Sequence, residues 1–187
     1  MSRTDVARKE RNRQILEYLN KEPFVNDEKL AKHFNVSINT IRLDRARLGI
    51  KEVRERIKER ASENEKKIIS LSKEEIIGNI IEFVPGEKAI SLLETQEYMS
   101  FENTDVIKGY HIYSMAESLA ISLIPNKVAL VGIANIKYVK KILKNEIIYA
   151  HAEVKKKRDT NYIVWVKIFD RNDELKFKGK FILKGIE

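Results

Sequence analysis

Residues 24–50 read FVNDEKLAKHFNVSINTIRLDRARLGI, and their pattern predicts the structure of the first part of the chain. Asn26 or Asp27 can cap a helix over DEKLAKHF, whose apolar side chains fall on one side. After a short break, Ser37 can cap a further helix over INTIRLDRARL (38–48). Two short helices joined by such a turn are typical of a helix-turn-helix.

A supporting helix is expected before this pair. In residues 5–19 the side chains of Ile15, Leu16 and Leu19 share one side of a helix, and Pro23 ends the segment. These apolar residues can form a small core with those of the next two helices. The sequence therefore predicts an all-α helix-turn-helix domain over residues 1–49.

A charge-rich segment follows, and we expect a linker helix over residues 50–75. Its apolar positions recur every three or four residues and form a narrow stripe, which consists of Ile50, Val53, Ile57 and Ala61. A stripe this thin cannot stabilise a free helix, so the helix needs a surface to dock on. The alternative interpretation is a solvated spacer.

The last part, residues 76–187, changes to strand-like runs separated by turns, with one helical stretch, HIYSMAESLAISLI (111–124). The runs lie at 80–84, 89–94, 128–139, 147–156, 162–169 and 177–185. The order of two strands, one helix and four strands predicts a hot-dog domain, in which an antiparallel sheet curves around a central helix. The expected fold class is therefore α+β.

Positive charge is concentrated at the front of the chain, whose formal net charge is +8. Residues 1–60 hold 16 Lys and Arg against 10 Asp and Glu, and they contain 10 of the 12 arginines. The planar fork of arginine suits phosphates and guanine edges. This distribution indicates an acidic polymer as partner, although a basic surface can also be merely solvated.

Several classes of site are excluded by composition. The chain has no cysteine, which removes disulfides, thiolate metal sites and cysteine nucleophiles and fits a reducing compartment. His33, His111 and His151 show no metal-ligand spacing, so we expect no metal. The N-terminus has no apolar core of a signal peptide, and no run approaches the roughly 20 apolar residues of a membrane span. We therefore expect a cytoplasmic protein with no membrane partner.

Two segments carry a family resemblance: residues 24–58, of which VSINTIRLDR is the most specific piece, and VIKGYHIYSMAESLA (106–120). They resemble the FapR family, repressors of bacterial fatty-acid and phospholipid synthesis genes. The resemblance implies a DeoR-like helix-turn-helix, a linker helix and a hot-dog domain that forms a homodimer. It further implies that malonyl-CoA binds the hot-dog domain and releases the protein from double-stranded operator DNA. Malonyl-CoA would be an effector, so we expect no cofactor and no enzymatic activity.

The residues expected to contact DNA lie at the start of the second motif helix and in the linker. They are Ser37, Asn39, Thr40, Arg42, Arg45, Arg54 and Arg56. Asn can bond to adenine and Arg to guanine, whereas basic linker side chains can enter or flank a minor groove. Ser37 can instead be only a cap, Thr40 can touch only a phosphate, and the linker arginines can be merely solvated.

Two departures from the family pattern concern DNA reading. The family usually has Gln at the place of Asn39, so the side chain has a shorter reach here and the DNA word can shift. The family tends to have Pro at the place of Lys51, and its loss removes a helix-start signal. The join between the helix-turn-helix and the linker helix can therefore be more continuous.

The positions that match the family's effector pocket are Phe101, Lys108, Gly109 and Glu117. Phe101 suits an apolar wall, or alternatively the core. Gly109 stands before the central helix and lets a ligand approach backbone amides, although it can be an ordinary turn glycine. Lys108 replaces the family's Arg, which pairs with the malonyl carboxylate, and loses the bidentate fork.

Glu117 replaces the family's Asn and would repel a ligand carboxylate. We hypothesise a Lys108–Glu117 pair in the empty pocket, displaced by the effector. Glu117 also favours an alternative function, a hot-dog acyl-CoA thioesterase fused to a DNA-binding head, in which a helix carboxylate acts as base. A further alternative is a constitutive DNA-binding protein whose hot-dog half only dimerises. The run KKKR (155–158) can meet CoA phosphates or be a solvated hairpin tip.

Overall fold

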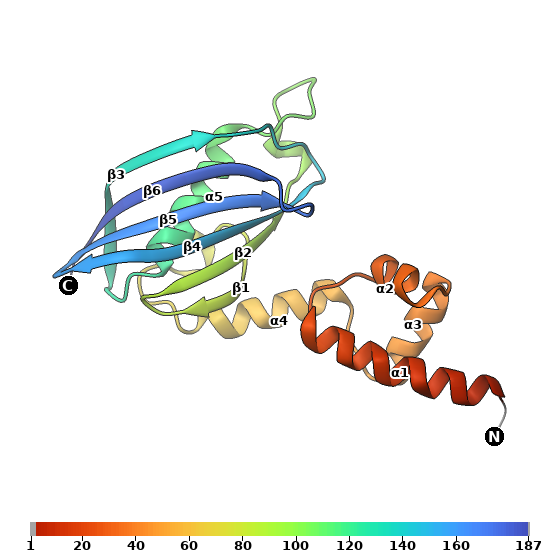
Figure 1. Cartoon of the computed structure of the whole chain (residues 1–187). Helices are drawn as coiled ribbons and strands as arrows, with labels where there is room; N and C mark the ends of the chain where they lie inside the picture. Colours follow the sequence, from red (N-terminus) through yellow and green to blue (C-terminus); the bar gives the residue numbers. More distant parts are fainter. Residues whose placement is uncertain (1–2, 187) are drawn as a thin grey trace. The chain divides into compact units, whose positions relative to one another are not determined.

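The computed structural model describes residues 3–186. The chain divides into two compact units between Glu59 and Arg60. The helical unit lies before this point and the sheet unit after it (Figure 1).

The helical unit contains three helices around one small core. They are α1 (Arg3–Lys21), α2 (Asp27–Phe34) and α3 (Ile38–Arg47). Asn26 caps α2, because its side chain accepts a hydrogen bond from the Lys29 amide at 2.9 Å, and Asn35 ends α2 in the left-handed conformation with φ 51°. The core consists of Ile15, Leu19, Val25, Leu30, Ala31 and Ile41. The expected helix-turn-helix is confirmed, with a first helix that is longer than residues 5–19.

The linker helix, α4 (Val53–Glu65), is shorter than the expected range of 50–75, which is a correction. Its end is closed by tight turns, in which the amide of Lys67 donates to the carbonyl of Asn64 at 3.0 Å. The buried Asn64 side chain donates to the carbonyl of Ile80 at 2.9 Å and so ties this end to the first strand. In residues 66–75, the rest of the expected linker helix, the structure has only a short 3-10 helix, η1 (Lys73–Glu75).

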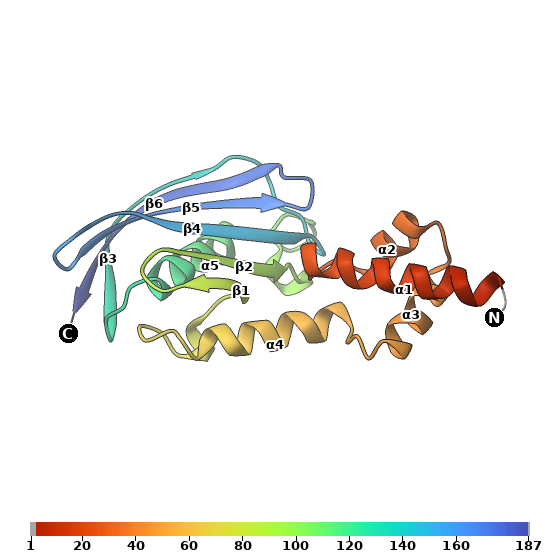
Figure 2. The same ribbon diagram turned by 60° about the horizontal axis from the view of Figure 1, so that its bottom comes forward.

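The sheet unit contains six antiparallel strands in the order β1-β2-β4-β5-β6-β3. The strands are β1 (Asn79–Val84), β2 (Lys88–Glu94), β3 (Val128–Tyr138), β4 (Ile147–Arg158), β5 (Asn161–Asp170) and β6 (Leu175–Ile186). All six were expected from the turns between the runs. The sheet curves around α5 (Gly109–Ser122), which Figures 1 and 2 show on one side of it. This is the hot-dog arrangement predicted from the element order.

The core of the sheet unit lies between α5 and the inner face of the sheet. Met115, Ala116 and Ala120 of α5 are fully buried, together with Phe177 and Phe181 of β6. Helix α5 begins two residues earlier than expected, directly after Lys108, which adopts the extended conformation of an N-cap. The helix ends at Ser122. Among residues 3–186, none of the helices combines the length and apolar composition that a membrane span requires.

Candidate functional site

Helix α3 has one buried and one exposed face. Ile41, Asp44 and Arg45 point into the helical unit. The opposite face is exposed and consists of Asn39, Arg42, Leu43 and Ala46. These positions are three and four residues apart, so their side chains can meet one groove of DNA together. Leu43, which is 57% exposed, and Ala46 were not among the residues predicted to contact DNA. Apolar side chains of this kind can contact a thymine methyl group.

Ser37 and Thr40 form the cap of α3. The Ser37 hydroxyl accepts a hydrogen bond from the Thr40 amide at 3.1 Å, and the two hydroxyl groups lie 2.9 Å apart. Both side chains therefore complete the start of the helix, as the capping interpretation of Ser37 predicts.

Arg45 is held inside the helical unit, which corrects the expectation that it contacts DNA. Its Nε and Nη2 donate to the two carboxylate oxygens of Asp27 at 2.6 and 2.7 Å, and Nη1 donates to the carbonyl of Ile50 at 3.2 Å. The Arg45 side chain is only 6% exposed. Arg42, in contrast, is 63% exposed and lies 3.7 Å from Asp27, so its guanidinium remains at the surface.

The helical unit holds a second carboxylate that pairs with an arginine, that of Asp44, and its role was not predicted from the sequence. It is fully buried and accepts a hydrogen bond from the Nε of Arg11 at 2.7 Å, with Arg47 at 3.5 Å. The signal that could have found it is its place three residues after the buried Ile41, on the same helix face. The Arg11–Asp44 pair links α1 to α3 and so helps to fix the orientation of α3 within the helical unit.

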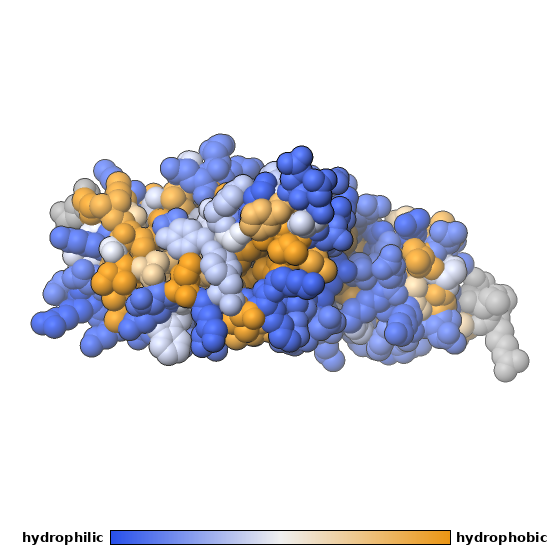
Figure 3. Space-filling view, turned by 90° about the horizontal axis from the view of Figure 1, so that it is seen from above, coloured by the Kyte–Doolittle hydropathy of each residue, from blue (hydrophilic) through white to orange (hydrophobic). Residues whose placement is uncertain are grey.

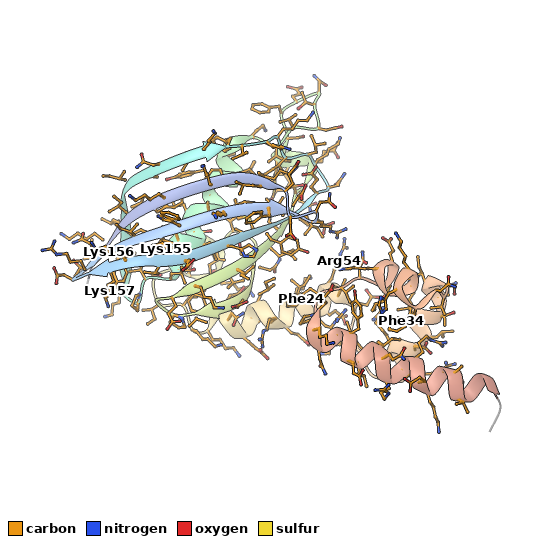
Figure 4. The ribbon with its side chains drawn as sticks, in the orientation of Figure 1. Phe24, Phe34, Arg54, Lys155, Lys156 and Lys157 are labelled. Atoms are coloured by element: carbon orange, nitrogen blue, oxygen red, sulfur yellow. The ribbon has the colours of Figure 1, made fainter. Side chains whose placement is uncertain are left out.

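The two linker arginines differ. Arg56 donates from Nη1 to the carbonyl of Pro23 at 2.6 Å and from Nη2 to the carbonyl of Val25 at 3.1 Å. These two hydrogen bonds hold α4 to the loop before α2. Burial, and then the charge of Arg45, lower the pKa of Arg56. In this structure Arg56 therefore has a structural role, and its DNA contact stays a prediction. Arg54 lies exposed in the first turn of α4 (Figure 4).

The start of α5 forms a candidate ligand site. Lys108 is half-buried at the N-cap, and its amide donates to the carbonyl of Met99 at 2.9 Å. The Tyr138 hydroxyl donates to the carbonyl of Gly109 at 3.0 Å, and a Cβ at Gly109 would lie 3.0 Å from the Tyr138 ring. A hollow of about 290 Å³ opens here, with Gly109, Tyr138, Lys140 and Lys141 in its lining. An anion in this hollow would meet lysines beside a helix N-terminus.

His111 lies next to this site. Its ring centroid is 4.3 Å from that of Tyr110 and 5.9 Å from that of Tyr98. Burial, and then the charge of Lys108, lower the pKa of His111. Its Nε2 is buried without a hydrogen-bond partner. Within the part of the chain that the structure describes, no cluster of His, Asp and Glu suits a metal ion.

The hypothesised Lys108–Glu117 pair is wrong within one chain. Nine residues separate them along a helix, which is roughly 13 Å, and no ion pair joins them among residues 3–186. Glu117 instead accepts a hydrogen bond from the Tyr113 hydroxyl at 2.9 Å. Burial, and then this bond to Glu117, raise the pKa of Tyr113 to about 12.

Phe101 lies on the surface, with 52% of its area exposed, so the core interpretation is wrong. The loop carries its ring outward, because the Phe101 amide bonds to the carbonyl of Val106 and its carbonyl accepts from the Thr104 amide. The KKKR run forms the end of β4, where Lys155 pairs with Glu153 and Lys157 lies 5.3 Å from the Tyr162 ring (Figure 4).

Comparisons with known proteins agree with both units. The DeoR-like helix-turn-helix domain family matches residues 11–67. A sigma28-regulated virulence protein from Campylobacter jejuni has a TM-score of 0.63 at 16% identity and covers 69% of this chain and 92% of its own. A Streptococcus mutans protein solved with acetyl CoA has a TM-score of 0.51 at 15% identity and covers 57% and 86%. At these identities the likeness concerns the fold alone.

Two relatives that match over most of their length have the same name. The protein named Transcription factor FapR from Caldanaerobacter subterraneus subsp. tengcongensis is 47% identical over 182 residues, which is 97% of this chain and 90% of that protein. The protein of the same name from Shouchella clausii is 37% identical over 95% and 93%. With a DeoR-like helix-turn-helix, a hot-dog unit and these relatives, the chain belongs to the FapR family of transcription factors.

Proposed function

We propose that this repressor acts in the cytoplasm on fatty-acid and phospholipid synthesis genes and that malonyl-CoA releases it from its operator. One observation carries the proposal: a single chain joins an exposed DNA-reading face on α3 to a hot-dog unit with a lysine-lined hollow at the start of α5. Phosphate contacts would supply much of the DNA affinity, which should therefore fall steeply with salt.

The edge strand β3 supports a homodimer. It pairs only with β6, and apolar side chains gather along it, as the view onto this edge shows (Figure 3). The exposed ones are Val128, Leu130, Ile133, Ile136 and Tyr138. An exposed apolar edge is a liability unless it is covered, and a second copy would cover it symmetrically. Two helical units would then meet two half-sites.

The lysines around Gly109 support an acyl-CoA as effector. Lys108 and Lys141 place positive charge near the amides of the first turn of α5, whereas Lys140 is paired with Glu174. A malonyl carboxylate or a CoA phosphate suits such a site. Because lysine is a point charge without a bidentate fork, we expect less discrimination between malonyl-CoA and other acyl-CoAs than an arginine would give.

Helix α4 is the element through which the two sites would be coupled. Ile57 is 8% exposed and Ala61 is 2% exposed, and Ile50 packs against the core of the helical unit. If the stripe of α4 docks differently in the two states, ligand would favour one arrangement and DNA the other. Replacing Ile57 with Ser should then weaken the coupling more than it weakens either binding event.

The experiment is a gel shift on the region upstream of this chain's own gene, titrated with malonyl-, acetyl- and longer acyl-CoAs. Release by malonyl-CoA is the expected result. Retained DNA binding with every CoA ester, and no thermal shift of the protein, would instead favour a hot-dog half that only dimerises. Release of free thiol from acyl-CoAs would favour the thioesterase, so its absence is the result that we expect.

A further inference from the structure

The outer face of the sheet, turned away from α5, carries lysines around the only tryptophan of the chain. On β5, Val164, Val166 and Ile168 are fully buried, so the alternating Trp165 and Lys167 point outward. We call the outward side chains of Lys137, Trp165, Lys167, Lys178 and Lys180 the outer patch. All five line one hollow of about 520 Å³.

Three lysines of the outer patch stand in one row. Lys178 on β6 lies directly opposite Lys137 on β3 and directly opposite Lys167 on β5. Neighbouring strands are about 4.8 Å apart, and like charges directly opposite each other destabilise a sheet. Among residues 3–186, no ion pair neutralises any of these three ammonium groups. The row therefore costs stability unless an anion covers it.

Trp165 lies in the next row, opposite Lys180 on one side and Glu153 on the other. The Trp165 residue is 46% exposed. Lys155, which pairs with Glu153, holds its ammonium group 5.8 Å from the ring centroid on the side of a second hollow of about 330 Å³. The Glu153 carboxylate is thus already neutralised by Lys155. The hollow of about 520 Å³ is lined both by Trp165 and by the three lysines of the row.

We infer that the outer patch binds single-stranded nucleic acid. Proteins that bind single strands without sequence preference combine a basic groove for the backbone with aromatic side chains on which bases stack. Here the lysine row would hold phosphates, and the Trp165 ring would lie about 7 Å away, two residues along the strand, where a base can reach it.

An acidic peptide fits this surface less well. Peptides that bind sheets add a strand at an open edge and draw affinity from main-chain hydrogen bonds. The outer patch lies on the face of β3, β6 and β5, which are already paired with one another. Of these strands only β3 has an open edge, and four of the five side chains of the outer patch stand on β5 and β6, which are paired on both sides. The patch therefore offers cations and an aromatic ring on a sheet face, so stacking of bases is the better match.

The fluorescence of Trp165 provides the test, because it is the chain's only tryptophan. The full chain, saturated with operator duplex to occupy the helical unit, is titrated at low salt with an oligothymidylate of about 16 nucleotides. We expect saturable quenching whose affinity falls with salt at a logarithmic slope of roughly −2 for three phosphate contacts. Lys167→Gln/Lys178→Gln should weaken this binding at least tenfold.

The matched control is Lys66→Gln/Lys127→Gln, which removes two exposed lysines elsewhere in the sheet unit and should change the affinity less than twofold. Both variants should fold and keep their operator binding, and Lys167→Gln/Lys178→Gln should unfold at the same or a higher temperature because it removes like charges that lie opposite each other. Absence of quenching, or equal quenching of the two double variants, would overturn the inference. Tighter binding of poly-glutamate than of the oligonucleotide would also overturn it and would assign the surface to an acidic protein.

Discussion

The Arg45–Asp27 pair gives the sharpest prediction about the helical unit, because it separates a structural arginine from a DNA-reading one. Arg45→Ala removes a bidentate pair with bonds of 2.6 and 2.7 Å between side chains that are 6% and 19% exposed. It leaves the Asp27 carboxylate without its main partner. Arg42→Ala, on the same helix, removes a side chain that is 63% exposed and 3.7 Å from Asp27.

The expected costs in the free energy of unfolding are well separated. Removing one partner of a buried ion pair costs about 3–5 kcal/mol. Because Asp27 keeps some contact with water, we expect the lower end, about 3 kcal/mol, for Arg45→Ala. An exposed pair contributes at most about 1 kcal/mol, so Arg42→Ala should leave stability nearly unchanged while it weakens operator binding.

The assay is urea denaturation of the full chain followed by circular dichroism, with operator affinity measured alongside. Asp27→Asn/Arg45→Ala should cost little more than Arg45→Ala alone, because the second change removes the carboxylate that the first left unpaired. If Arg45→Ala has a free energy of unfolding within about 0.5 kcal/mol of that of the unaltered chain and yet loses operator affinity, Arg45 contacts DNA and its structural role is wrong.

Three further predictions follow from single contacts. Arg56→Ala should lower the free energy of unfolding of the helical unit by about 1–3 kcal/mol, because it frees the carbonyls of Pro23 and Val25; unchanged stability in urea would contradict this. Gly109→Ala should lower the melting temperature by pushing the Tyr138 ring from its bond to the Gly109 carbonyl, and if Tyr138→Ala does not remove the effect, the explanation fails. The pKa of Tyr113 is raised to about 12, so its contribution to the free energy of unfolding is complete below pH 10 and is lost as the pH rises through 12. Tyr113→Phe should therefore make the free energy of unfolding depend less on pH between 10 and 12. An unchanged pH dependence in the variant would contradict this.

Local signals in the sequence predicted most of the fold. The caps at Asn26 and Ser37 are present in the structure, because a side chain that satisfies its own helix start acts within a few residues. The strands were predictable because each run ends at a turn, as at Asp159, whose φ is 54°. The length of α4 was not predictable, since its end depends on the bond from Asn64 to Ile80 in a distant strand.

The candidate site was harder to predict because arginines look alike in a sequence. Arg42, Arg45 and Arg56 share charge and neighbourhood, but only tertiary packing decides which carbonyl or carboxylate each one meets. Helical spacing offered a partial signal, since Arg45 lies four residues after the buried Ile41. The Lys108–Glu117 hypothesis failed for a simpler reason: a helix separates the two side chains, and Tyr113 is one turn from Glu117.

If the DNA site and the acyl-CoA site are coupled, each ligand must lower the affinity of the protein for the other. Calorimetric titration of malonyl-CoA into the free protein and into its operator complex gives two dissociation constants. If the effector weakens operator binding by a given factor, operator DNA must weaken effector binding by the same factor, which for a coupling of about 1–3 kcal/mol is about 5- to 150-fold. A lower affinity for malonyl-CoA in the operator complex is the expected result, and equal dissociation constants with and without the operator would show that the two sites are not coupled.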